Sequence, residues 1–406
     1  MPHCLIITPF PLSAPKHGGQ VRAASVAWAL RHAGWQVDMA GIFHERFFPP
    51  EEWGPHDIVL QGDALADRAL GDILFADLHV ARAAARQPEV VAQLRRLLAR
   101  LRPDMVHVEH PWDWLVLRQA LPDSGPRPRI VYSSQNIEWS ARAPFFRLGM
   151  KRPGDDALVL ATRALELDFA RAADLVFSIS DLEAAEIEQE SGRPVVYLPA
   201  VSDLAQPTST AGGRFAREAG AAGIRYAATM GSAYWPNVEG FFDVFPQGLG
   251  FLAHDEQIWA AGALGRAIHE DKRYNDFRTI NETRFRATGY VEDSEKAGFF
   301  AAAACVLVPV RIGAGAKLKM ADAVASGCAV IATPHAVEGY GPLVAEAIDD
   351  GIYVADTPRD YRALVRRALR EGLPGCSPAV RARLGLGHMA GIMVGALATL
   401  PGLQDH

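Results

Sequence analysis

The stretch "CVLVPVRIGAGAKLKMADAVASGCAVIAT", residues 305–333, decides the fold class of this chain. Its first part, "CVLVPVR", has the length and apolar character of a buried strand. The glycine-containing loop "GAGAKLK" and the helical run "MADAVASG" follow, and "AVIAT" then restores an apolar strand. Strand, loop, helix and strand in this order predict a parallel βαβ unit.

The loop of this unit has the composition of an anion-binding site. Gly313 and Gly315 lack Cβ atoms, so backbone N–H groups can approach an anion, and a helix beginning near Lys317 adds its dipole. Together with Lys319, these groups would suit a diphosphate and the charge that develops when a phosphate leaves. The alternative is a tight turn in which Lys319 pairs with Asp322 on a solvated helix face.

The same alternation of strands and helices recurs along the chain, which predicts parallel sheets covered by helices. Further apolar runs typical of buried strands lie at residues 3–10, 36–43, 104–110, 129–135, 174–180, 194–200, 225–232, 255–264 and 285–291.

The length of 406 residues exceeds what one core ordinarily holds, and the turn-forming run "LAQPTSTAGG" interrupts the alternation near its middle. We therefore predict an α/β fold of two Rossmann-like, doubly wound domains. The expected parts are a first domain at residues 1–204, a linker at 205–213, a second domain at 214–380, and a terminal helix at 381–406 that packs back on the first domain.

Composition narrows the function. A net charge of −6 gives no electrostatic reason to expect a nucleic-acid partner. The four cysteines lie far apart, which suits reduced thiols in a cytoplasmic protein, and the start "MPHCLIITPFPL" lacks a secretory apolar region. The uncharged run at residues 384–404 contains histidine, proline and many small residues, so we expect a packed helix there and not a membrane span.

A basic amphipathic helix is expected within residues 79–103. Its arginines stand at positions 82, 86, 95, 96, 100 and 102. Two interpretations stay open: an ordinary surface helix with a solvated arginine face, or a peripheral contact with an anionic membrane at its inner face.

Residues 308–339, "VPVRIGAGAKLKMADAVASGCAVIATPHAVEG", resemble the donor-binding segment of GT-B glycosyltransferases, in particular the large retaining group called family 4. The shared elements are a basic residue before Gly-x-Gly, a Lys-Leu-Lys element, an apolar strand and a late Glu-Gly. Four more segments are similar to family elements in the same order: "KHGGQVRA" (16–23), "EHPWDWL" (109–115), "SSQNIEWSARAP" (133–144) and "MGSAYWPNVEGFFDVF" (230–245).

The resemblance implies transfer of a sugar from a nucleoside-diphosphate sugar to a hydroxyl acceptor, which is a glycan, a lipid-linked molecule or a small molecule. It also implies retention of anomeric configuration, a role in polysaccharide biosynthesis, and no cofactor besides the donor substrate. Metal independence agrees with the absence of any Asp-x-Asp motif and of metal-ligand spacing among the histidines. Two alternatives stay open: a sugar-nucleotide epimerase of the same architecture, and a non-catalytic subunit that binds nucleotide sugar.

The resemblance also assigns residues. His110, at the end of a predicted strand, is the catalytic candidate nearest the transferred sugar, with Glu109 as its neighbouring alternative and Lys317 and Lys319 as charge stabilisers. The expected donor-binding residues are Gly231, Ser232, Arg311, Gly313, Gly315, Lys317, Lys319, Asp322 and Glu338. The expected acceptor-side residues are Gly18, Gly19, Arg22, Asn136 and Glu138, of which Arg22 would meet an anionic acceptor.

Several positions depart from the family pattern. Asp322 stands in place of a glutamate, Gln135 in place of a histidine and Ala200 in place of an asparagine. These departures keep the non-catalytic alternative open. Trp112 and Trp114 are predicted to pack in the core, with stacking on a sugar as the alternative.

Overall fold

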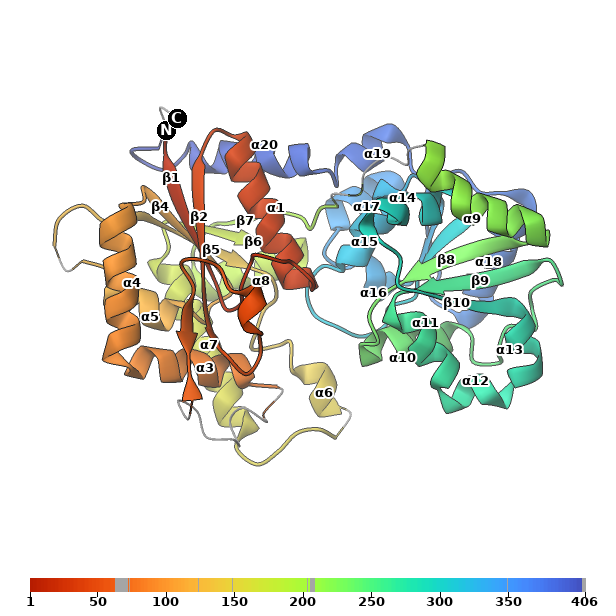
Figure 1. Cartoon of the computed structure of the whole chain (residues 1–406), viewed down its shortest axis with the longest axis horizontal. Coiled ribbons are helices and arrows are strands. Elements are labelled where there is room, and N and C mark those ends of the chain that lie inside the picture. The colour runs from red at the N-terminus through yellow and green to blue at the C-terminus, as the bar shows by residue number, and fades with distance from the viewer. Residues whose placement is uncertain are drawn as a thin grey trace. The chain divides into compact units, whose positions relative to one another are not determined.

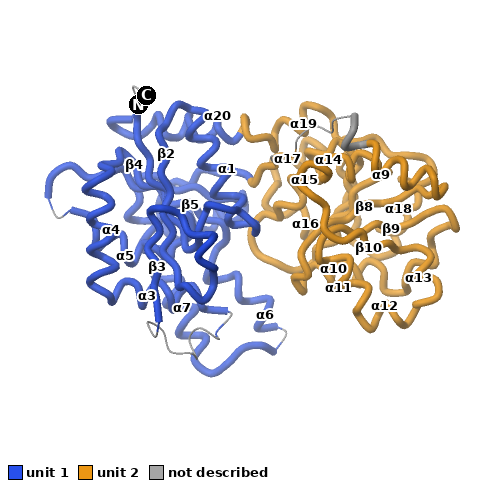
Figure 2. Tube along the Cα trace, in the orientation of Figure 1, with its two compact units in different colours: residues 1–199, 389–406 blue, residues 200–388 orange. Residues whose placement is uncertain are grey.

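The computed structural model describes residues 1–62, 72, 74–122, 124–147, 149–202, 204, 209–348 and 350–403. The chain forms two compact units (Figure 2). One contains residues 1–199 together with 389–406, and the other contains residues 200–388. Each unit is built on a parallel sheet flanked by helices, as the sequence predicts (Figure 1).

The sheet of the first unit is seven-stranded, with the order β3-β2-β1-β4-β5-β6-β7. Its strands are β1 (His3–Thr8), β2 (Gln36–His44), β3 (Ile58–Leu60), β4 (Met105–Glu109), β5 (Arg129–Ser134), β6 (Leu175–Ser178) and β7 (Val195–Tyr197). Cys4 on β1 pairs with Val37 of β2 on one side and with Met105 of β4 on the other. The strand order therefore reverses between β1 and β4, and ligands of such sheets bind beyond the carboxyl ends of the strands at this point.

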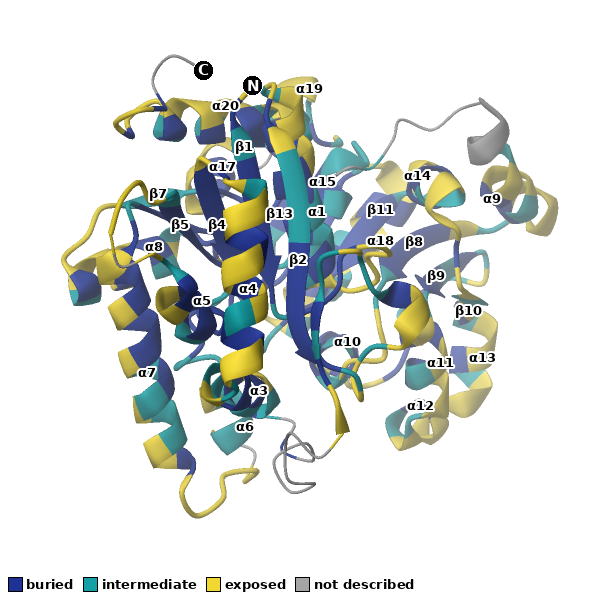
Figure 3. Cartoon of the chain, turned by 60° about the vertical axis from the view of Figure 1, so that its left-hand side comes forward, coloured by how far each residue is buried: buried dark blue, intermediate teal, exposed yellow. Residues whose placement is uncertain are grey.

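Helices cover the apolar strands of the first unit. They are α1 (Gly18–His32), η1 (Pro50–Glu52), α3 (Ala76–Arg86), α4 (Pro88–Leu101), α5 (Trp114–Ala120), α6 (Ala143–Arg147), α7 (Asp155–Ala172), α8 (Asp181–Ser191) and α20 (Leu386–Leu397), of which α20 belongs to this unit from Met389 onward. Figure 3 shows exposed outer faces on α4 and α7, whereas the strands behind them are buried. Arg22 on α1 donates to the Met389 sulfur at 3.1 Å, which fixes α20 against α1.

The expected single basic helix is wrong, because the segment forms two helices that break at Gln87 and Pro88. Proline has no N–H and fits the first turn of a helix, so α3 ends before it and α4 begins with it. α4 is amphipathic as expected, with buried leucines on one side. On its exposed side, Arg96 pairs with Glu89 at 2.6 Å.

The sheet of the second unit is six-stranded, with the order β10-β9-β8-β11-β12-β13. Its strands are β8 (Arg225–Met230), β9 (Glu256–Ala261), β10 (Phe285–Gly289), β11 (Cys305–Val308), β12 (Val330–Ala332) and β13 (Ile352–Val354). The order reverses between β8 and β11, so the loops that follow these two strands flank the switch point.

The helices of the second unit pack closely on its sheet. They are α9 (Ser209–Ala222), α10 (Trp235–Val244), α11 (Ala263–Glu270), α12 (Lys272–Asp276), α13 (Arg278–Arg284), α14 (Asp293–Ala301), α15 (Leu318–Ala325), α16 (Pro334–Val337), α17 (Gly341–Ala347), α18 (Pro358–Glu371) and α19 (Pro378–Ala382). Gly240 lets the backbone of α10 approach the segment after β11 closely, since a Cβ at this position would lie 1.7 Å from the Pro309 carbonyl oxygen. α10 thus lies directly against the segment that leaves β11.

The segment predicted as a linker, residues 205–213, differs in its second half, where α9 already begins at Ser209. Residues 205–208 lie outside the described residues. Near the C-terminus, α19 and α20 occupy the region where we predicted one terminal helix. Within the described part of the chain, no helix combines the length and the apolar character needed to cross a membrane.

Candidate functional site

The lysine loop, residues 313–319, connects β11 to α15 at the switch point of the second sheet. Gly313 and Gly315 have φ angles of 138° and 64°, which other residues rarely adopt. Lys317 is the N-cap residue of α15, and its ammonium group donates to the Gly315 carbonyl at 2.6 Å. The hydroxyl of Tyr340 holds the Lys317 carbonyl at 3.0 Å. The loop therefore combines two glycines in conformations that favour glycine, a helix N-terminus and a lysine, and the helix begins where it was predicted.

Lys319 connects the loop after β11 with the loop after β8. Its ammonium group contacts the side-chain oxygen of Asn237, at the start of α10. Asn237 in turn donates to the Ser232 carbonyl at 3.0 Å. Burial, followed by the nearby charge of Lys317, lowers the pKa of Lys319 to about 8. A lysine destabilised in this way gains most from an anion that arrives beside it.

The alternative interpretation, in which Lys319 pairs with Asp322, is wrong. Asp322 pairs with Lys296 of α14 at 2.8 Å and accepts a hydrogen bond from Ser202 at 2.6 Å. Each carboxylate oxygen of Asp322 thus has one partner within the unit and can accept a further hydrogen bond, as expected for a ribose contact.

Glu338 lies near the lysine loop through a histidine that the sequence analysis missed. His335 of α16 contacts the Gly313 carbonyl at 2.9 Å through Nε2 and Glu338 at 2.6 Å through Nδ1. Burial and the charge of Lys317 lower the pKa of His335, whereas Glu338 opposes the shift. The i,i+3 spacing of His335 and Glu338 was the available sequence signal.

The other predicted donor residues surround the same switch point. Gly231 follows β8, and a Cβ there would lie 3.3 Å from the Asn237 amide nitrogen, so any side chain at this position would press on Asn237. Arg311 follows β11 and lies 3.4 Å from the Asp356 carboxylate. All of these groups come from the carboxyl ends of parallel strands.

In the first unit, His110 directly follows β4 at the switch point of the sheet. Its φ of 68° is uncommon for a residue other than glycine, and such strain is frequent at functional sites. Nδ1 of His110 lies 2.9 Å from Glu138, and its side chain remains 12% exposed. Burial alone would lower the pKa of His110, but the hydrogen bond and charge of Glu138 raise it.

Glu138 is the centre of a buried network. Despite its burial, the charge of Arg142 and the hydrogen bond with His110 lower the pKa of Glu138 to about 2. Its backbone N–H donates to Glu166 at 2.9 Å, and Tyr132 donates to the other oxygen of Glu166 at 2.7 Å. The sequence predicted that Glu138 faces an acceptor. With a side chain only 5% exposed, Glu138 instead orients His110. Asn136 lies beside Glu138, to which its amide donates at 3.4 Å.

Glu109 belongs to a second buried network. It is fully buried, and it accepts hydrogen bonds from Gln135 at 2.7 Å and contacts His107 at 2.9 Å. Gln135 also donates to the Gly19 carbonyl at 3.2 Å, so its departure from the family histidine has a structural use. Of the two adjacent candidates, only His110 keeps its side chain accessible.

The N-terminal glycine loop forms the start of α1. Gly18 is its first residue and is exposed, whereas a Cβ on Gly19 would lie 3.1 Å from Gln135. Arg22 is 1% exposed and donates to the carbonyls of Pro199 and Leu198 at 2.8 and 2.9 Å. The expected contact of Arg22 with an anionic acceptor is therefore wrong, because its guanidinium holds backbone oxygens inside the unit.

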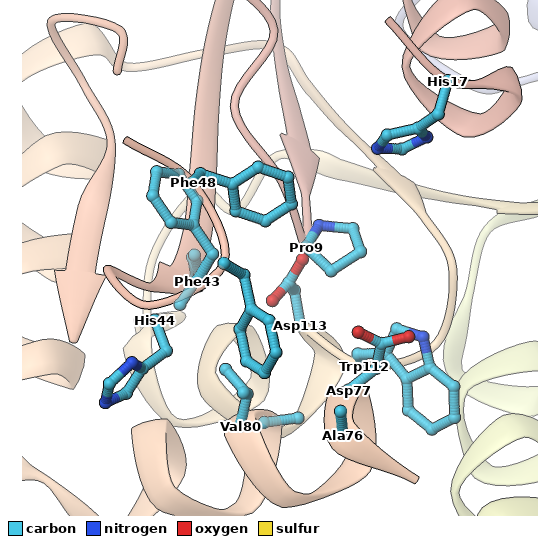
Figure 4. A pocket seen from close by; sticks show the side chains of 13 residues that line it. Pro9, His17, Phe43, His44, Phe48, Ala76, Asp77, Val80, Trp112 and Asp113 are labelled. Carbon is cyan, nitrogen blue, oxygen red and sulfur yellow. The ribbon is translucent and has the colours of Figure 1, made fainter. Parts of the chain in front are cut away.

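A pocket of about 310 Å³ opens beside these residues in the first unit (Figure 4). Its lining comes from β2, α3 and the segments that follow β1, β2 and β4: Pro9, His17, Ile42, Phe43, His44, Phe47, Phe48, Ala76, Asp77, Val80, Ala81, Trp112 and Asp113. Trp112 is almost fully buried behind the pocket, and Trp114 stacks on Phe169 at 4.7 Å, which confirms core packing for Trp114. Asp77 and Asp113 were not found from the sequence, because their proximity depends on the sheet order.

The residues that the structure describes contain no cluster of three or more His, Cys, Asp or Glu side chains suited to a metal ion. The polar groups described above are His110 with Glu138 at the switch point of the first sheet, and Lys317 and Lys319 at the switch point of the second sheet.

Comparisons with known proteins agree with this architecture. Residues 225–371 match the family model of the glycosyl transferases group 1, and residues 17–200 match that of the glycosyl transferase 4-like domain. A sequence comparison with curated proteins gives no match.

Solved structures of similar fold cover nearly the whole chain. Sucrose-phosphate synthase from Thermosynechococcus elongatus is 17% identical, with a TM-score of 0.65 and 97% of each chain covered. HepE from Anabaena, solved with UDP and glucose, is 12% identical, with a TM-score of 0.67, 98% of this chain and 100% of HepE covered. WaaG, from lipopolysaccharide biosynthesis, is 14% identical, with a TM-score of 0.57 and coverage of 98% and 100%.

Proposed function

Because the chain is a GT-B glycosyltransferase that belongs to the glycosyl transferases group 1, we propose that it uses a nucleoside-diphosphate sugar as donor. The transfer goes to a hydroxyl group, with retention of configuration and without a metal ion. The observation that carries this proposal is the lysine loop, where a partly buried lysine of lowered pKa lies at a helix N-terminus. HepE, which shares the fold, was solved with UDP-glucose.

In this proposal the lysine loop binds the diphosphate. Because Gly313 and Gly315 lack Cβ atoms, backbone N–H groups of the loop can approach the diphosphate. Lys317 exchanges its contacts with loop carbonyls for contacts with phosphate oxygens. Lys319, held by Asn237, provides a second positive charge. The two lysines and the helix terminus thus replace a metal ion as the positive charge beside the phosphates.

The reaction exchanges one bond to the anomeric carbon of the donor sugar for another. The bond from this carbon to the diphosphate oxygen breaks, and the nucleoside diphosphate leaves with the electron pair. The acceptor oxygen forms the new bond to the same carbon on the face that the diphosphate leaves, and its proton passes to the departing diphosphate oxygen. Lys319 stabilises the charge that grows on the leaving oxygen. His110, which Glu138 holds in place, faces the transferred sugar.

Calorimetry with UDP, GDP and ADP, followed by detection of nucleoside diphosphate released from a panel of nucleotide sugars, tests the proposal. We expect one nucleotide to bind and its sugar to turn over. Lys319→Ala should lower kcat/KM by roughly 2–4 kcal/mol of transition-state stabilisation, while Lys272→Ala on an exposed helix leaves it unchanged. If neither nucleotide binding nor turnover depends on Lys319, the lysine loop is only a turn.

His110→Ala separates catalysis from binding. We expect it to lower kcat far more than it weakens nucleotide binding, because His110 lies in the first unit and the lysine loop in the second. Turnover that requires no acceptor and yields an altered sugar would indicate an epimerase. Binding without any turnover would indicate a non-catalytic subunit.

A further inference from the structure

The pocket beside His110 has an apolar body. Ring side chains from β2 and the segment after it, Phe43, Phe47 and Phe48, form one wall. Val80 of α3 and Trp112 lie across the pocket from Phe43 and Phe48 (Figure 4). Phe47 is 40% exposed although it is a large apolar residue. Aromatic walls around a volume of about 310 Å³ suit an aromatic or alkyl group of a ligand.

Two carboxyl groups lie in the same pocket. Asp113 is 2% exposed, and its Oδ2 has no hydrogen-bond partner among the described residues, which is unusual for a buried carboxyl. Burial raises the pKa of Asp113 well above its usual range, and the charge of Asp77 adds to this effect while His110 opposes it. Asp77, at the start of α3, keeps contact with solvent. A buried carboxyl without a partner is the group that a ligand hydroxyl would satisfy.

The ionisable groups around the pocket also restrict the charge of the ligand that it can bind. Among its described lining residues there is no lysine or arginine, and the nearby guanidinium of Arg142 is engaged by Glu138. An anionic group entering the pocket would therefore meet two carboxyl groups with no lysine or arginine in the described lining, and the adjoining His110, whose pKa is raised, is already paired with Glu138, so its entry is costly. A hydroxyl group can donate a hydrogen bond to either carboxyl without that cost.

We propose that this pocket binds the acceptor, and that the acceptor is an uncharged molecule with an aromatic or alkyl body and hydroxyl groups directed toward Asp77 and Asp113. The proposal rests on the glycosyl-transfer function proposed above. It replaces the anionic acceptor expected from the sequence, since Arg22 is occupied by backbone carbonyls. The pocket adjoins His110, whose charge acts on Asp113.

Three matched probes test this assignment by calorimetry or saturation-transfer NMR on the full chain. 2-Naphthyl β-glucoside has an apolar body and hydroxyl groups, 2-naphthyl β-glucuronide adds one carboxylate, and methyl β-glucoside lacks the apolar body. We expect the naphthyl glucoside to bind at least about tenfold more tightly than either of the others, because a buried unpaired charge or a missing apolar contact each costs more than about 1.4 kcal/mol.

Substitutions inside and outside the pocket test whether the naphthyl glucoside binds there. Ala76→Phe fills the pocket from α3, and Phe48→Ala removes its opposite wall, so both should weaken the naphthyl glucoside at least about tenfold. Ala157→Phe, on an exposed face of α7, is the matched control and should leave binding unchanged. UDP is titrated in parallel, and its binding should be the same in all three variants.

Equal or tighter binding of the glucuronide would overturn the proposal, as would wild-type affinity in both pocket variants. These failures are distinct from failure of the donor function, which would appear as loss of UDP, GDP and ADP binding in the wild-type chain. Retained nucleotide binding with no naphthyl glucoside binding rejects the pocket assignment alone.

Discussion

Replacing Lys319 by methionine should stabilise the protein while it weakens nucleotide binding. The side chain is partly buried, and burial together with the charge of Lys317 lowers its pKa from 10.5 to about 8. A lowered lysine pKa means that the folded state disfavours the charged form, and each unit corresponds to about 1.36 kcal/mol. The charged side chain therefore costs at most about 3.4 kcal/mol at neutral pH. Lost hydrogen bonding to Asn237 and solvent screening reduce the expected gain to about 1–2 kcal/mol.

The pH dependence of this gain identifies its cause. Below about pH 8 the lysine is charged in both the folded and the unfolded chain, so the full penalty is present. Between about 8 and 10.5 the unfolded chain binds more protons than the folded chain, so wild-type stability rises with pH relative to the variant. The difference between variant and wild type should therefore be constant below pH 8 and should disappear by about pH 10.5.

Differential scanning calorimetry between pH 6.5 and 10.5 measures both effects. At pH 7 we expect the transition of the second unit to rise by about 2–8 °C in Lys319→Met, given a shift of about 2–4 °C per kcal/mol for a unit of this size. Lys272→Met, on an exposed face of α12, should change it by less than about 1 °C. A lower transition temperature for Lys319→Met at pH 7, or a gain that does not shrink at alkaline pH, would refute the reasoning.

Three further changes test other parts of the structure. Glu138→Gln removes the charge that raises the pKa of His110, so NMR titration should show His110 losing its proton at lower pH than in the wild type, and an unchanged midpoint would contradict the network. Gly240→Ala places a Cβ against the Pro309 carbonyl and should lower the free energy of unfolding by about 3 kcal/mol in urea titrations, whereas Gly220→Ala, with open space around it, should raise it by up to about 1 kcal/mol. Nucleotide affinity measured by calorimetry should be the same with and without excess EDTA, and binding that requires magnesium or manganese would show that the lysines do not suffice.

The fold could be predicted from the sequence because apolar strands and helices alternate clearly in it. Eleven strands were expected in their places, but β3 and β13 were missed. Each of these two strands is only three residues long and lies at an edge of its sheet, so periodicity gives little signal. The break between α3 and α4 was also missed, although Pro88 marks it, because the basic pattern continues across the proline.

The site was predictable where neighbouring residues in the sequence form it. The lysine loop is local, so its glycines, its lysines and the helix start at Lys317 follow from the sequence alone. The partners of these groups come from other strands and are set by sheet order. Nothing in the local pattern indicates that Lys319 contacts Asn237, or that Asp322 pairs with Lys296.

The same limit explains the error about Arg22 and the omission of Asp113. Arg22 lies in the second turn of α1, where a solvent-facing or ligand-facing arginine is the ordinary expectation, yet backbone carbonyls just after β7 accept its hydrogen bonds. Asp113 stands at the start of α5, where a capping role is expected, yet no side-chain capping bond forms. Asp113 thus leaves the helix start uncapped by a side chain, and its buried Oδ2 has no hydrogen-bond partner among the described residues. Its presence beside an aromatic-walled pocket is therefore best explained by a hydroxyl-bearing ligand that supplies the missing donor.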